Sequence, residues 1–250
     1  MGVCKGLTMS EWKQKRFWKS VHVVSSEAGY FIKLDDKILK TPAKRQMMLP
    51  TEALAKKVAS EWDEQVEEID PTTMPFTKSA NAVMDKVSEQ YEEVSSLLSE
   101  YGETDLLYYR ADSPPELQKR QKTGWDPIVK WAENTFKVQI NCGTGIVYIP
   151  QNEKLFSETH KKINSLSIFE LTAFYDMVSI TGSLILGLAI INGRLSAEEA
   201  YQLSRIDEQW QLEQWGEDEE AQVASNLKNI AILHSEEFFA LSDGNISTIF

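Results

Sequence analysis

Cysteine and histidine are scarce in this sequence, whose 250 residues include two Cys and three His. A disulfide framework is not expected, because Cys4 lies close to the N-terminus and has only Cys142 as a partner, and sparse cysteine favours a reducing compartment. We expect Cys142 to be a small buried thiol. Each histidine is expected to be a solvated or core residue, since none stands in a catalytic or metal-binding spacing.

Motifs that carry chemistry are also missing. The chain has no Gly-x-x-x-x-Gly-Lys phosphate loop, no His-Glu-x-x-His zinc helix and no Glu-x-x-His element of a di-iron bundle. Gly143-Thr144-Gly145 resembles the start of a dinucleotide turn, but an extended pattern follows it over 146–150, so we expect a hairpin-like turn. The sequence therefore predicts no catalytic residues, no metal and no cofactor.

Positive charge is in deficit, since 26 Lys and Arg face 38 Asp and Glu for a net charge of -12. This balance argues against a nucleic-acid binder, which needs excess cations to displace counterions from phosphates, and against adsorption to anionic lipid. The longest uncharged run, 177–193, has 17 residues and contains Ser, Thr, Asn and Gly, so it predicts a buried helix rather than a membrane span. The N-terminus lacks the apolar stretch of a secretory signal.

The first part of the chain predicts strands packed on a helix. Segments 20–24, 30–34 and 38–40 are strand-like and separated by turns, which is typical of a β-meander. A helix is expected after Thr51, a candidate N-cap. A break over 69–75, with two prolines, then separates this part from the rest of the chain.

Nearly every periodic segment after that break is helical. An apolar stripe recurs every three to four residues over 80–101, and Asp126-Pro127 predicts a helix start. Capping boxes that begin at Ser167 and Ser196 predict two further helices. We expect 166–191 to be the central helix of a bundle, with small residues every fourth position that allow another helix to approach closely.

The predicted fold class is α+β: a small N-terminal α/β domain, in which a β-meander packs on a helix, followed by a larger all-α helical bundle. The predicted boundaries are a flexible N-terminus over 1–15, the α/β domain over 16–76, the helical domain over 77–242 and a tail over 243–250.

Negative charge is concentrated in one stretch, since no basic residue occurs between Arg205 and Lys228. Trp210 and Trp215 lie within it. Three interpretations are open at this point: a solvated helix end with buried tryptophans, a divalent-metal cluster, and a protein-binding surface with indole anchors and hydrogen-bonding carboxylates. The seven carboxylates, which supply more than half of the net charge of -12, are Asp207, Glu208, Glu213, Glu217, Asp218, Glu219 and Glu220.

Nine short motifs, taken in order along the chain, resemble one family. They are RFWK at 16–19, LDDKILKTP at 34–42, ASEWD at 59–63, MPFTK at 74–78, TDLLYYRA at 104–111, WDP at 125–127, GSLIL at 182–186, DEQWQ at 207–211 and WGED at 215–218. The series is similar to the assembly chaperones of the ATP synthase α subunit, the twelfth ATP-assembly factor family, called complex assembly factor two in mitochondria.

The resemblance implies a small N-terminal α/β domain, a larger helical domain and a non-enzymatic function. Such a chaperone binds the free α subunit of the F-one sector, prevents its aggregation and hands it over during assembly of the α/β hexamer. Matched residues Trp62, Trp125 and Arg110 are expected to have core or architectural roles. The resemblance places partner binding on acidic residues near the C-terminal end and on two tryptophan anchors: Asp207, Glu208, Trp210, Trp215, Glu217 and Asp218.

One departure from the family pattern is the second turn, where Asp35-Asp36 replaces the usual Asp-Gly; Asp enters the left-handed region less readily than Gly, so another turn type is expected. We expect a monomer with no nucleic-acid partner and no stable membrane insertion, in the bacterial cytoplasm or, in a eukaryote, the mitochondrial matrix. The alternatives are a protein-binding module with another client and a divalent-metal hydrolase that uses the carboxylates of 207–220.

Overall fold

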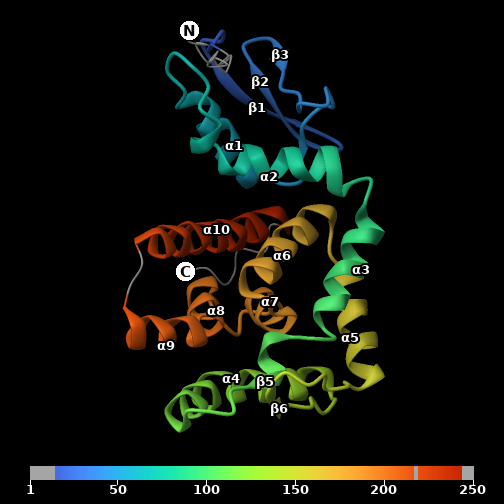
Figure 1. Cartoon of the computed structure of the whole chain (residues 1–250). Helices are drawn as coiled ribbons and strands as arrows, with labels where there is room; N and C mark the ends of the chain where they lie inside the picture. Colours follow the sequence, from blue (N-terminus) through green and yellow to red (C-terminus); the bar gives the residue numbers. More distant parts are fainter. Residues whose placement is uncertain (1–14, 217–218, 244–250) are drawn as a thin grey trace, which may run out of the picture.

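The computed structural model describes residues 15–216 and 219–243, and Figure 1 shows how the elements are arranged. The N-terminal sheet consists of β1 (Val21–Ser26), β2 (Gly29–Leu34), β3 (Lys37–Ile38) and β4 (Met48–Leu49). β1 and β2 pair antiparallel along their whole length, and β3 and β4 pair with the two ends of β2. The predicted meander is confirmed, and β4 adds a returning strand to it.

The turn between β2 and β3 accommodates Asp35 because hydrogen bonds to its carboxylate hold the residue in place. Asp35 adopts the left-handed conformation, with φ 53°. Its carboxylate accepts hydrogen bonds from the backbone N–H groups of Lys19 (3.0 Å) and Ser20 (2.9 Å) and from the Ser20 hydroxyl (3.1 Å). These bonds, led by the one from Lys19, lower the pKa of Asp35 and offset the strain of a side chain at positive φ.

Helix α1 (Glu52–Asp63) packs against β1 and β2 (Figure 1). It begins where the sequence predicts, because the Thr51 hydroxyl accepts the Leu54 N–H at 3.1 Å. Leu54 and Val58 on its inner face are fully buried.

A carboxylate on α1 caps the next helix, α2 (Pro75–Ala82). The N-cap residue Met74 offers no side-chain hydrogen bond, and Glu61 accepts instead from the N–H groups of Phe76 (2.6 Å) and Thr77 (2.7 Å). The first N–H groups of a helix need such partners, and the helix dipole favours an anion there. The two family-like motifs that contain Glu61 and Phe76 therefore form one contact.

The apolar stripe predicted over 80–101 does not lie on one helix. α2 ends at Ala82, the π-helical turn η2 (Val83–Val87) follows, and α3 (Tyr91–Tyr101) begins after a further turn. In a π-helical turn the backbone hydrogen bond spans five residues instead of four. The Ser88 N–H donates such a hydrogen bond to the Val83 carbonyl. The spacing of apolar residues cannot reveal this break, because each piece keeps the helical period.

The helix start predicted at Asp126-Pro127 is wrong, because α4 (Pro115–Phe136) runs through Pro127. A proline inside a helix removes a hydrogen bond and costs about 3 kcal/mol. Trp125 and Ala132 are fully buried on either side of it, and their packing outweighs that cost.

The predicted central helix is in fact two helices, α6 (Ile168–Thr181) and α7 (Leu184–Ile191). Gly182 adopts the left-handed conformation (φ 66°) between them, and the Ser183 hydroxyl caps α7 by accepting the Leu186 N–H at 3.0 Å. The chain turns back on itself, so Gly187 of α7 meets α6; an added Cβ there would lie 2.7 Å from Val178 Cγ2. The close approach expected at the small residues therefore involves side chains of α6.

Both predicted capping boxes are present, at Ser167 before α6 and at Ser196 before α8 (Ala197–Ser204). β6 (Gly143–Thr144) pairs in parallel with β5 (Tyr109–Arg110), so Gly143 lies in a short strand rather than in the hairpin-like turn expected there. The remaining elements are η1 (Pro71–Thr73), η3 (Leu106–Tyr108), α5 (Glu153–Asn164), α9 (Ile206–Trp215) and α10 (Glu219–Asp243).

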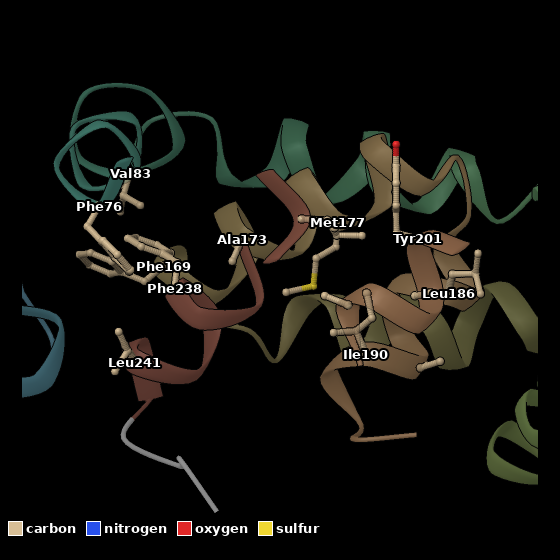
Figure 2. Packing of buried hydrophobic residues seen from close by; sticks show 14 of the residues in the cluster. Phe76, Val83, Phe169, Ala173, Met177, Leu186, Ile190, Tyr201, Phe238 and Leu241 are labelled. Atoms are coloured by element: carbon tan, nitrogen blue, oxygen red, sulfur yellow. The ribbon is translucent and has the colours of Figure 1, made fainter. Parts of the chain in front are cut away.

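Helix α10 lies between the N-terminal layer and the other helices, and it packs on α6, α8 and α1 (Figure 1). Its Phe238 ring stacks with those of Phe76 and Phe169, at centroid distances of 6.4 and 6.2 Å (Figure 2). One buried apolar cluster runs from Trp18, just before β1, to Leu241 in α10. The fold class is α+β, with a small sheet region followed by a larger helical part, as predicted; the domain boundary near residue 76 stays a prediction.

The uncharged run 177–193 is divided between α6, the turn at Gly182, α7 and the turn that follows α7, and most of its side chains are buried. Within residues 15–216 and 219–243, none of the helices has both the length and the apolar composition that crossing a membrane requires.

A buried carboxylate connects two distant parts of the helical region, and its removal tests this connection. Asp105 accepts from the Leu107 N–H (2.9 Å), the Ser183 hydroxyl (2.8 Å) and the Ile185 N–H (2.9 Å), and burial raises its pKa to about 6. We predict that Asp105→Ala lowers the free energy of unfolding by about 3 kcal/mol, because three buried donors lose their acceptor. Urea unfolding followed by circular dichroism measures this change.

The matched control is Asp112→Ala, which removes an exposed carboxylate and should change the free energy of unfolding by less than about 0.5 kcal/mol. Similar values for the two variants would contradict the role given to Asp105.

Candidate protein-binding surface

Helix α9 carries the first part of the acidic stretch and is held against α4. The buried amide of Gln121 donates to the Asp207 carboxylate at 2.7 Å. Glu208 pairs with Arg205 at 3.0 Å at the start of α9. Asp207 and Glu208, two of the predicted partner-binding residues, are therefore half-buried and bonded within the chain.

Arg120 on α4 binds two more residues of α9. Its guanidinium donates to both carboxylate oxygens of Glu213, at 2.8 and 2.6 Å, and lies 4.8 Å from the centre of the Trp210 ring. The hydrogen bonds from Arg120 lower the pKa of Glu213. Both charged groups are exposed, so the pair contributes little to global stability and acts mainly by fixing the position of Trp210.

Trp125 binds the last turn of α8, just before α9 begins. Its ring is fully buried, and its Nε1–H donates to the Leu203 carbonyl at 2.8 Å. The neighbouring Gly124 leaves room for Ile206, because an added Cβ would lie 2.8 Å from Ile206 Cδ1. Arg110 lies 4.9 Å from the centre of the Trp125 ring. Trp125 and Arg110 thus have the architectural roles expected of them.

The end of α9 and the start of α10 are exposed. Trp215, the last residue of α9, is 80 % exposed. Glu219 and Glu220 begin α10 and are exposed too, and the Cα atoms of Trp215 and Glu219 are at most about 14 Å apart because only three residues separate them. Glu217 and Asp218 lie outside the described residues, so the roles predicted for them stay predictions. An exposed indole beside carboxylates is suited to binding a protein partner.

Three of the four exposed large apolar side chains on α10 form a row, and they were not among the residues expected from the sequence. Val223, Leu227 and Ile230 are 60 %, 62 % and 64 % exposed, and their spacing places them on one face of the helix. We call them the apolar row. The spacing is visible in the sequence, but it equally describes a buried face, so only the structure identifies the row as exposed.

Cys142 is exposed, not buried as expected. Its thiol lies 3.6 Å from the Leu107 carbonyl, and partial burial of the sulfur raises its pKa, which is the opposite of what an activated nucleophile needs. It borders a hollow of about 350 Å³ together with Arg110, Lys122 and Asp126. Among the residues that the structure describes, no histidine lines this hollow.

The acidic residues of α9 do not converge on one point. Asp207, Glu208 and Glu213 bond to three different residues, Gln121, Arg205 and Arg120. In the described part of the chain, which leaves out Glu217 and Asp218, no three or more His, Cys, Asp or Glu side chains are grouped so that they could hold a metal ion.

Comparison with known proteins gives the family. The family model described as ATP12 chaperone protein matches residues 15–133. The crystal structure of Atp12 from Paracoccus denitrificans is 44 % identical in sequence, and the match covers 93 % of this chain and all of that one with a TM-score of 0.90. The chain belongs to the ATP12 chaperone family.

Two further relatives agree with this assignment. Mitochondrial protein atp12 of Schizosaccharomyces pombe is 29 % identical over an alignment of 229 residues, and the match covers 86 % of this chain and 79 % of that protein. Atu1473 of Agrobacterium tumefaciens is 35 % identical, with 91 % of this chain and 85 % of that one covered and a TM-score of 0.84. The ATP12 family model ends within α4, and the matches to the two crystal structures, which cover 93 % and 91 % of this chain, extend beyond it.

The contacts of Arg120 predict a local effect of its removal. In Arg120→Ala, the amide hydrogens of residues 206–215 are expected to exchange faster, because α9 loses two side-chain contacts to α4, while the free energy of global unfolding stays nearly the same. Hydrogen exchange followed by mass spectrometry measures this. Lys119→Ala removes a neighbouring exposed cation and serves as the control; unchanged exchange of α9 in Arg120→Ala would contradict the anchoring role.

Proposed function

We propose that this protein is a non-enzymatic chaperone that binds the free α subunit of the F-one sector of ATP synthase and hands it over during assembly of the α/β hexamer. The observation that carries the proposal is membership of the ATP12 chaperone family, with 44 % identity to the Paracoccus protein over nearly the whole chain. We place it in the cytoplasm of a bacterium or, in a eukaryote, in the mitochondrial matrix. The name of the S. pombe relative, which is called mitochondrial, supports the second location.

The task of such a chaperone follows from the state of its client. A subunit of a ring exposes its apolar interfaces while it is alone, and such surface aggregates. A protein that binds this surface keeps the subunit soluble by mass action. The affinity of the chaperone for the subunit must be low enough for the neighbouring subunits to displace the chaperone. Because this competition drives release, no nucleotide hydrolysis is required.

The end of α9 and the start of α10 support this proposal. Trp215 offers an exposed indole, and Glu219 and Glu220 add exposed negative charge to a protein with a net charge of -12. Such a surface attracts a client patch that is apolar at its centre and basic at its edge. Asp207 and Glu208 serve this surface by positioning α9, since both are bonded within the chain.

The proposal is tested directly by aggregation of the client. Isolated α subunit is expected to scatter less light on warming when an equimolar amount of this protein is present, because its interface is covered. The β subunit of the same enzyme is the matched control client and is expected to aggregate as before. No delay of α aggregation together with no co-purification would contradict the proposal, and equal protection of both subunits would indicate a general protein-binding module.

Trp215 provides a test of the binding surface. Trp215→Ala is expected to weaken binding of the α subunit by about tenfold or more, since exposed aromatic anchors dominate many interfaces. Its 80 % exposure leaves the free energy of unfolding unchanged. The control is Phe17→Ala, an aromatic residue that is 60 % exposed just before the sheet. Titration calorimetry gives both affinities, and equal values for the two variants would exclude Trp215 as an anchor.

A further inference from the structure

The apolar row lies on a part of α10 that is exposed to solvent. Val223, Leu227 and Ile230 stand at positions i, i+4 and i+7 of one helix, which at about 100° per residue places them within an arc of about 60°. On the opposite side of the same helix, Ile232 is fully buried. The row is therefore a straight apolar ridge along roughly two turns, with solvent in front of it.

The part of α10 that carries the apolar row is also held in place. The hydroxyl of Tyr201 in α8 donates a hydrogen bond to the Ser225 carbonyl at 2.8 Å, and the Tyr201 and Ser225 hydroxyl oxygens are 2.9 Å apart. Further along α10, Phe238 packs between two other aromatic rings (Figure 2). A ridge that is ordered before binding loses little conformational entropy when a partner covers it.

Charge beside the ridge limits which partners fit. From Ile206 to Leu227 the chain has no Lys or Arg, and Glu219 and Glu220 lie at the start of the ridge. Pairing two copies of this ridge would bring these acidic groups close together, which disfavours a second copy of the chain as the occupant. A partner with Lys or Arg beside an apolar surface is favoured instead.

We propose that α10 inserts the apolar row into an apolar groove with a basic rim on the free α subunit, so that the chaperone supplies the helix and the client supplies the groove. Anchors at i, i+4 and i+7 are the mark of helix-in-groove recognition. Trp215, at most about 14 Å from the start of α10, extends the contact beyond the helix. This inference rests on the proposed function. It goes further by naming the helix that binds the client and the shape and charge of the client's binding site.

The decisive experiment uses the full chain with Val223→Gln, Leu227→Gln and Ile230→Gln combined. Gln keeps a high helix propensity and removes the apolar contact. Affinity for purified α subunit, measured by titration calorimetry, is expected to fall at least about 100-fold. Binding by the unchanged protein is expected to weaken as salt is raised, because the rim contacts are between charges.

The matched control combines Ala221→Gln, Ala224→Gln and Ala231→Gln, three exposed positions on other sides of the same helix. It introduces the same three side chains without removing the row, so its affinity should stay within about twofold of the unchanged protein. Both variants are expected to show the urea midpoint and circular dichroism of the unchanged protein.

Four results would overturn the inference. If the unchanged protein binds the α subunit and the row variant binds equally well, the row is not the recognition element although the proposed function stands. If the unchanged protein does not bind the α subunit, the proposed function and the inference fail together. A dimer that only the row variant loses would make a second copy the occupant, and a lower urea midpoint in the row variant would show that the row packs within the chain.

Discussion

Buried carboxylates that accept from the first N–H groups of distant helices are the constraint on which this fold depends. Asp105 reaches the start of α7, and Glu61 reaches the start of α2. A buried carboxylate is costly unless donors surround it, and a helix start is a place where several donors point the same way. Burial raises the pKa of both groups, so the hydrogen bonds are what make their position tolerable.

These two contacts decide where the rest of the molecule can lie. Glu61 ties the sheet and α1 to α2, and α2 in turn contributes Phe76 to the aromatic stack with α6 and α10. Asp105 ties the turn before β5 to the junction of α6 and α7. The chain leaving β5 enters α4, whose Trp125 donates a hydrogen bond to the Leu203 carbonyl in the last turn of α8, just before α9. A continuous series of packed elements thus leads from the sheet to the candidate surface.

The acidic stretch has two different uses along its length. In α9 the carboxylates of Asp207, Glu208 and Glu213 are bonded within the chain and hold the helix in position. At the start of α10, Glu219 and Glu220 are exposed, and the exposed side chain of Val223 follows on the same helix. A chaperone that must release its client benefits from this division, because a rigid support presents a small surface whose contacts can be replaced by those of the true neighbours.

The sequence by itself determined the local features and the family. These are the Thr51 cap, the capping boxes at Ser167 and Ser196, the meander, the α+β class and the family. Each depends on residues a few positions apart, or on the order of motifs, so no tertiary information was needed. The predictions of a helix start at Pro127 and of a continuous helix through Gly182 are wrong, because packing against distant elements decides whether such a residue interrupts a helix.

Exposure was decided by the tertiary structure alone. The spacing of Val223, Leu227 and Ile230 is that of any amphipathic helix, and the charges of Asp207 and Glu208 look the same in the sequence whether a partner or a neighbouring helix receives them. Which face of a helix meets solvent depends on elements far away in the chain, because packing is a property of the whole fold and periodicity is a property of one segment.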